Sequence, residues 1–241
     1  MSKRNDILRL IAIITMAIDH IGLLFFPELL ILRIIGRLAF PIFAYALATG
    51  FIKTSNRKRY FLTILIFAFI AQIPYMFLTE NANFNPLQFN ILFLFAYAII
   101  VLYVIEEYKK QRAQNTIFKP LLLLILSIVM TLVPVILEHT LQIAFSYATY
   151  GVLMVIGFYL FNDFNKKNIL LLSIWFVLIN GFNIFYLIVG IGYQALSLVA
   201  LPLIILLIKY THPKFKLNKY VSYIFYPAHL AILVAIRLLI G

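Results

Sequence analysis

Long apolar runs separated by short polar stretches dominate the pattern along the chain. A helix needs roughly 20 apolar residues to cross the hydrocarbon core of a membrane. Runs of about this length are Ile7–Phe26, Leu30–Phe51, Tyr60–Leu78, Leu87–Ile105, Phe118–Leu137 and Ile143–Phe161. We expect the first run to be a retained helix, because two polar residues interrupt it and no small-residue cleavage site follows.

The remaining apolar sequence predicts three further helices. The stretch Asn168–Lys209 would be about 63 Å long as one helix, which is two bilayer thicknesses. We therefore split it near Gly181, Gly190 and Gly192, where turns are favoured. Tyr220–Ile240 completes the series. The pattern thus predicts an all-α bundle of about nine transmembrane helices.

The charges between the predicted helices alternate and so indicate an orientation. With the N-terminus inside, every inner loop carries lysine or arginine: Lys53, Arg57, Lys58 and Arg59, then Lys109, Lys110, Arg112 and Lys119, then Lys166 and Lys167, then Lys209, Lys214, Lys216 and Lys219. The outer loops carry Glu28, Glu80, Glu138 and His139. Because positive loops stay in the cytoplasm, we expect the N-terminus inside and the C-terminus outside.

Composition agrees with a membrane protein and narrows the chemistry. The chain is 64% hydrophobic and 12% charged, with a mean hydropathy of +1.03, whereas soluble domains are about half apolar and a quarter charged. The net charge of +12 is explained by the inner loops, so we expect no nucleic-acid partner. The chain has no cysteine. Its histidines are scattered, so we expect no metal site; they are His20, His139, His212 and His229.

A few ionisable and polar side chains interrupt the apolar runs at similar predicted depths. Asp19 and His20 lie in the first helix, Arg37 in the second, Gln72 in the third and His229 in the last. Intramembrane charges are costly and are therefore functional candidates. Asp19 and His20 point about 100° apart on a helix, so Asp19 is expected to pair with Arg37 across the first hairpin. A purely structural role for each of these groups is the alternative.

Arg9 and His20 are eleven positions apart, close to three helical turns, so both should project from one face about 16 Å apart. Arg9 would lie at the cytoplasmic end and His20 deep in the membrane. This spacing suits a long ligand with an anionic head and a buried reactive end, such as acetyl-coenzyme A. We expect both side chains to line one cavity open to the cytoplasm. His20 would then act as a general base or take the acyl group itself.

Several motifs, in this order, resemble the TraX family, named for conjugal-transfer pilin acetylases: "IDHIG", "LRIIGRLAFPIFAYALATGF", "AQIPY", "YGVLMVIGFYL" and "FYPAHL". The resemblance covers nearly the whole chain. It also extends to a wider group of transmembrane acyltransferases, whose first helix often has an arginine, ten residues and a histidine, here Arg9 and His20. That group tends to end in a Tyr-rich helix carrying a histidine, here His229. Ser146 stands where TraX-type sequences often have an acidic residue, which leaves the acceptor open.

Together these features predict a single acyltransferase-like domain over residues 1–241 in a bacterial cytoplasmic membrane. It would move an acetyl group from cytosolic acetyl-coenzyme A to a peptide, glycan or lipid head group. The candidate catalytic residues are His20, Asp19, Arg37 and His229, and the candidate coenzyme-binding residues are Arg9, Lys53, Arg57 and Gln72. The alternatives are a transporter or flippase with these groups as a relay, and an accessory subunit of an export complex.

Overall fold

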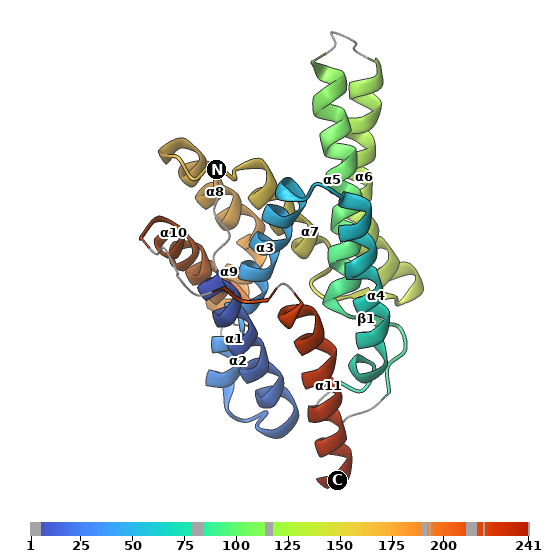
Figure 1. Cartoon of the computed structure of the whole chain (residues 1–241), viewed down its shortest axis with the longest axis vertical. Helices are drawn as coiled ribbons and strands as arrows, with labels where there is room; N and C mark the ends of the chain where they lie inside the picture. Colours follow the sequence, from blue (N-terminus) through green and yellow to red (C-terminus); the bar gives the residue numbers. More distant parts are fainter. Residues whose placement is uncertain are drawn as a thin grey trace.

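The computed structural model describes residues 6–78, 84–113, 118–188, 192, 194–210, 216–218 and 220–240. Almost all of this is helix, which confirms the predicted all-α class (Figure 1). The α-helices are α1 (Asp6–Phe25), α2 (Leu30–Gly36), α3 (Ala39–Lys53), α4 (Arg57–Tyr75), α5 (Ile91–Arg112), α6 (Phe118–Leu141), α7 (Ala148–Leu160), α8 (Lys166–Ile179), α9 (Gly181–Ile188), α10 (Ala200–Tyr210) and α11 (Val221–Ile240). The 3₁₀ helix η1 (Gln194–Val199) and two short strands, β1 (Gln88–Phe89) and β2 (Ala144–Phe145), complete the elements.

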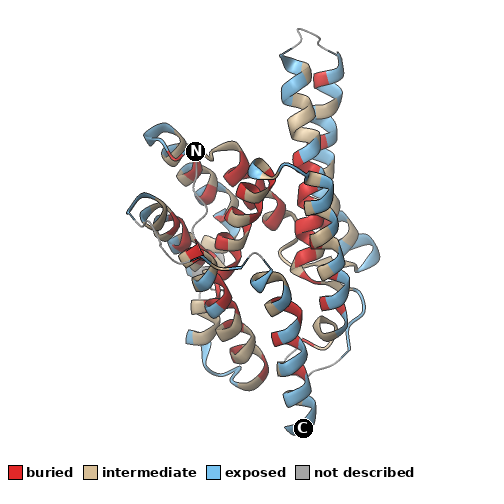
Figure 2. Cartoon of the chain, viewed as in Figure 1, coloured by how far each residue is buried: buried red, intermediate tan, exposed pale blue. Residues whose placement is uncertain are grey.

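The chain is built as a multi-pass membrane protein. Within the described residues, five helical segments are long and apolar enough to cross a membrane: Asp6–Phe25, Leu30–Lys53, Ile91–Arg112, Phe118–Leu141 and Val221–Ile240. Large apolar side chains along α6 and α11 face outward, as expected for helices in contact with lipid (Figure 2). The total of about nine crossings and their orientation stay predictions.

The second apolar run is divided into α2 and α3 at Arg37 and Leu38, where one continuous helix was predicted. Pro41 accounts for the break. Its ring would collide with the carbonyl group four residues earlier, which is that of Arg37, and proline has no backbone N–H to donate. The two pieces still form one apolar segment, Leu30–Lys53. The break places Arg37 at the junction of two helices.

The stretch Asn168–Lys209 also differs from the prediction of two helices. The predicted break at Gly181 is present, because α8 ends at Ile179 and α9 begins at Gly181. A Cβ atom added to Gly181 would meet nothing within 4 Å. The predicted turn at Gly190 lies outside the described residues. After it come η1 and α10, so this stretch forms several short helical segments.

The bundle is organised around α3, which packs against α1, α5, α7 and α10. Helices α1 and α2 form a tight hairpin, and α11 packs against both α1 and α4. In Figure 1 the α5–α6 pair extends beyond the rest of the bundle at the top, while α11 ends at the bottom. Buried side chains concentrate on α3, α5 and α7, as the red segments in Figure 2 show. Helix α1 therefore lies between α2, α3 and α11, and its polar residues contact the α2 segment and α11.

Candidate active site

The carboxylate of Asp19 is held by two arginines of the α1–α2 hairpin. Arg37 Nη2 donates to Asp19 Oδ1 at 2.6 Å, which confirms the predicted ion pair. Arg33 Nη1 lies 3.0 Å from Asp19 Oδ2 and also donates to the Asp19 backbone carbonyl at 2.8 Å. Arg33 was not among the residues predicted from the sequence. It lies four residues before Arg37 and hence on the same face of α2, a spacing that could have identified it.

Glycine makes this close packing possible. A Cβ atom on Gly36 would lie 2.2 Å from Asp19 Oδ1, and one on Gly22 would lie 2.7 Å from Leu32 Cβ. Both distances are too short for any side chain, so the two helices touch through their glycines. This contact lets the carboxylate of Asp19 reach the guanidinium groups of α2. The glycine in "IIGR" thus belongs to the site although it carries no chemistry.

Asp19, Arg33 and Arg37 together carry one excess positive charge, next to His20. The side chains of Asp19 and Arg37 are only 12% and 10% exposed. Buried charges must be paired and hydrogen-bonded to be tolerated. Arg37 satisfies this with two more bonds, from Nη1 to Gln194 Oε1 at 2.8 Å and from Nε to the Arg33 carbonyl at 3.1 Å. An excess positive charge in an apolar layer favours an anion or a developing negative charge.

His20 faces α11 and contacts His229. His20 Nδ1 and His229 Nε2 are 2.7 Å apart, and the two rings are almost coplanar, with 6° between their planes. The sequence places both histidines at similar predicted depths, but it does not pair them. The helix crossing of α1 and α11 brings the two histidines together, which no spacing within one helix indicates. We call Asp19, His20, Arg33, Arg37 and His229 the charged cluster.

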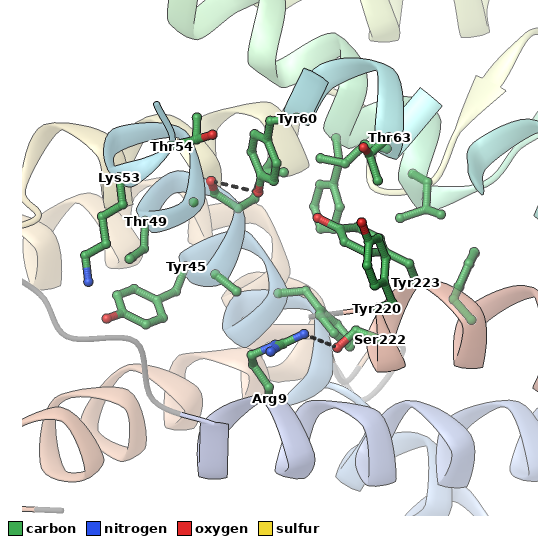
Figure 3. A pocket seen from close by; sticks show the side chains of 18 of the residues that line it. Arg9, Tyr45, Thr49, Lys53, Thr54, Tyr60, Thr63, Tyr220, Ser222 and Tyr223 are labelled. Atoms are coloured by element: carbon green, nitrogen blue, oxygen red, sulfur yellow. Dashed lines mark hydrogen bonds between the residues drawn. The ribbon is translucent and has the colours of Figure 1, made fainter. Parts of the chain in front are cut away.

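A cavity of about 570 Å³ lies between α1, α3, α4 and α11 (Figure 3). Figure 3 shows Arg9 reaching from α1 toward Ser222, to whose Oγ it donates at 3.0 Å. Along α3, the side chains of Tyr45, Thr49 and Lys53 border the same space. The cavity's volume is in the range typical of small-molecule sites.

Three basic side chains, Arg9, Lys53 and Arg59, line this cavity. We call them the basic rim. Arg9 is anchored, because its guanidinium also contacts Asp6 Oδ1 at 3.1 Å. Lys53 and Arg59 are exposed, and neither forms an ion pair with an acidic side chain in the described part of the chain. These two charges are thus available to an anionic ligand.

The predicted common cavity of Arg9 and His20 needs correction. Both side chains do face α11, as the eleven-residue spacing requires, because Arg9 bonds Ser222 and His20 bonds His229. His20, however, is not among the residues that line the cavity. In the region between Arg9 and His20, the cavity is bordered by Met16 on α1 and Tyr226 on α11.

The cavity nevertheless ends next to the charged cluster. The ring centroid of Tyr226, which lines the cavity, is 5.8 Å from that of His229. Met16 lies one helical turn before His20 on α1. The bulky side chains of Met16 and Tyr226 thus form a partition between cavity and imidazoles. His20 itself is only partly buried.

Arg57 and Gln72 are not brought to the cavity. Arg57 forms an ion pair with Glu106 and lies over the ring of Phe51, 4.5 Å from its centroid. The side chain of Gln72 donates to the Gln88 carbonyl at 2.8 Å and accepts from Asn90 Nδ2 at 2.8 Å. In these positions Arg57 links α4 to α5, and Gln72 holds the segment that precedes α5.

Asn90 shows how that segment is fixed. Its side-chain oxygen accepts from the backbone N–H of Leu92 at 2.9 Å and so caps α5. Strand β1, just before it, pairs in parallel with β2. Within the described residues, no three His, Asp or Glu side chains gather closely enough to hold a metal ion.

Comparison with known proteins places the chain in a family. Residues 4–237 match the TraX protein family, so the chain belongs to that family. An uncharacterized protein of Rickettsia prowazekii is 42% identical over 69 residues, covering 29% of this chain and 26% of the relative. The probable fimbrial assembly protein FimC of Dichelobacter nodosus is 34% identical over 108 residues, covering 40% and 44%. The chain thus spans less than half the length of either relative, and no solved structure matches it.

Proposed function

We propose that this protein is a membrane acyltransferase that moves an acetyl group from cytosolic acetyl-coenzyme A to an amine or hydroxyl acceptor. The observation that carries the proposal is the position of the His20–His229 pair, directly beyond the end of a cavity with a basic rim. Membership of the TraX family, which is named for pilin acetylases, supports the same reaction. The proposed location is a bacterial cytoplasmic membrane.

The cavity suits the donor substrate. The phosphates of acetyl-coenzyme A carry several negative charges, and Lys53, Arg59 and Arg9 offer positive charge where the cavity is lined by polar groups. The pantetheine arm is long, thin and uncharged. It would extend along the apolar wall toward Met16 and Tyr226. For transfer, the side chains of Met16 and Tyr226 at the end of the cavity would have to move aside so that the thioester reaches His20.

The charged cluster supplies the groups that acyl transfer needs. His20 removes the proton from the acceptor O–H or N–H as the acceptor atom attacks the thioester carbonyl. The carbonyl oxygen gains negative charge, which the excess positive charge of Arg33 and Arg37 stabilises. The C–S bond then breaks, the acetyl group stays on the acceptor, and the coenzyme leaves as a thiolate that takes the proton from His20.

The two substrates would approach from opposite sides. The donor enters through the basic rim, while His20 keeps partial exposure although it does not line the cavity. The acceptor would therefore reach His20 from within the membrane or from its outer side. A peptide, a glycan and a lipid head group all offer a suitable nucleophile. The name of the Dichelobacter relative, a probable fimbrial assembly protein, favours a pilin-like polypeptide among them.

The proposal is tested with the purified chain in lipid nanodiscs. We expect it to bind acetyl-coenzyme A at micromolar to millimolar concentration and to transfer labelled acetyl to a pilin-like peptide, with His20→Ala as the inactive control. A protein that binds no acetyl-coenzyme A, but moves protons or a solute across vesicles in a His20-dependent manner, would instead support a transporter. Neither activity would point to an accessory subunit of an export complex.

A further inference from the structure

The hydrogen bonds of the two histidines fix which nitrogen atoms carry protons. His229 Nδ1 lies 2.8 Å from the backbone carbonyl oxygen of Phe225. A carbonyl oxygen only accepts, so His229 Nδ1 must be the donor and carry a proton. In the neutral imidazole the other nitrogen, Nε2, is then an acceptor.

The hydrogen bond to His229 also determines which nitrogen of His20 carries a proton. Its Nδ1 lies 2.7 Å from His229 Nε2. Because His229 Nε2 accepts, His20 Nδ1 must donate, so it carries the proton of the neutral His20 ring. The lone pair of His20 is then left on Nε2. No hydrogen bond to this atom is present among the residues that the structure describes. His20 therefore donates to His229, and His229 donates to the carbonyl oxygen of Phe225.

We infer that His229 is a positioning residue that holds His20 in the Nδ1–H tautomer, so that His20 Nε2 is the atom that takes the proton of the acceptor. This inference rests on the proposed function for its chemical meaning, but the tautomer can be measured without it. An isolated imidazole in water favours neither a fixed ring orientation nor the Nδ1–H form. A short hydrogen bond from a neighbouring helix supplies both.

The packing of His229 explains why it can fix another ring. Its own ring stacks on Phe225, with 4.8 Å between centroids and 10° between planes, and it lies beside Tyr226. The bond to the Phe225 carbonyl is made one helical turn back along α11. The side chain of His229 is buried, at 7% exposure. A ring that is stacked on Phe225 and hydrogen-bonded at one nitrogen presents its second nitrogen in one direction.

The pair also handles the proton after it is taken. When His20 Nε2 accepts a proton, the ring becomes an imidazolium, and its Nδ1–H bond to His229 becomes charge-assisted and stronger. No bond has to break for this to happen. The leaving thiolate then recovers the same proton from Nε2, which returns both rings to their starting state. His229 thus takes no part in bond making with the substrate.

The direct test is the tautomer of His20, read by ¹⁵N nuclear magnetic resonance on protein labelled at histidine in nanodiscs. We expect His20 Nε2 to give the signal of an unprotonated nitrogen, assigned by its loss in His20→Gln. His229→Leu removes the acceptor while keeping similar bulk, so His20 should lose its fixed tautomer. His229→Gln offers an amide oxygen near the former Nε2 position and should restore it. His139→Gln, a change at an exposed histidine, is the matched control.

Kinetics provides a second readout for the same variants. We expect His229→Leu to lower kcat by about 10- to 100-fold, less than the loss of the general base itself, and His229→Gln by only a few-fold. The KM for acetyl-coenzyme A should stay unchanged, because His229 does not line the cavity. A protonated Nε2 on His20 in the unmodified protein would overturn the inference, even if His229→Leu failed to fold. If His20 has the expected tautomer but the protein transfers no acetyl group, the inference about His229 stands and the proposed function is rejected.

Discussion

The charged cluster and the basic rim both contain arginine, yet Arg37 of the cluster and Arg59 of the rim have opposite surroundings. In the cluster, Arg37 is 10% exposed and bonds Asp19, Gln194 and a backbone carbonyl. In the rim, Arg59 is exposed and has no acidic partner within the described residues. Charge in an apolar layer must be matched by the protein itself, whereas charge next to water is left for a ligand. The cluster is therefore suited to positioning and the rim to binding.

The largest effect separates chemistry from binding. We expect His20→Ala to lower acetyl transfer by about 10²- to 10⁴-fold, the usual loss for a general base. Binding of acetyl-coenzyme A should not change, because His20 does not line the cavity. Transfer of labelled acetyl and equilibrium binding of the coenzyme are measured on the same preparation. His139→Ala is the control. Full transfer by the His20 variant would remove the cluster from the chemistry.

The next effect concerns stability and compares the same residue type in the two regions. We expect Arg37→Met to lower the free energy of unfolding by about 3 kcal/mol, as is typical when one partner of a buried ion pair is lost. Arg33 would still contact Asp19, which keeps the loss from being larger. Arg59→Met should leave stability nearly unchanged. Thermal unfolding midpoints in one detergent give the comparison, and equal midpoints for the two variants would contradict it.

The sequence predicted the parts of the cluster that lie on neighbouring segments. The Asp19–Arg37 pair followed from matched depths across a short hairpin, and the shared face of Arg9 and His20 followed from helical geometry. Pairing between distant segments was not predictable in this way. His20 and His229 are 209 positions apart, and only the crossing of α1 and α11 determines that they meet.

Charge, depth and run length alone led to three predictions that the structure does not bear out. Arg57 was assigned to the coenzyme because of its positive charge alone. The sequence does not distinguish it from Arg59, since only the folded structure brings Glu106 of α5 against Arg57. Gln72 was assigned to the same site by depth, yet depth says nothing of the helix face on which it lies. The break at Arg37 was encoded by Pro41, but an apolar run of the right length concealed it.

A smaller effect is expected at the rim. The double variant Lys53→Gln, Arg59→Gln should raise the KM for acetyl-coenzyme A by about tenfold and leave kcat unchanged. Each exposed charge contact contributes up to about 1 kcal/mol, and about 1.4 kcal/mol corresponds to a factor of ten. The KM of the unmodified protein should also rise with salt, and that of the variant should rise less. A fall in kcat with constant KM would show that the rim does not serve as the binding region.

The smallest effect is expected for Arg57→Gln. Arg57 lies only two residues before Arg59 in the sequence, so the two variants compare a paired and an unpaired arginine. Arg57 is bonded to Glu106 and covers the ring of Phe51, so its positive charge is already matched, as in the cluster. Its side chain is 29% exposed, and partly exposed pairs contribute little. We therefore expect a loss of about 1 kcal/mol in stability and no change in the KM for acetyl-coenzyme A. Titrating both variants, Arg57→Gln and Arg59→Gln, with the coenzyme under identical conditions makes the test. If Arg57→Gln weakened binding as much as Arg59→Gln, the matched charge would be reaching the ligand, and the contrast between paired and unpaired arginines would fail.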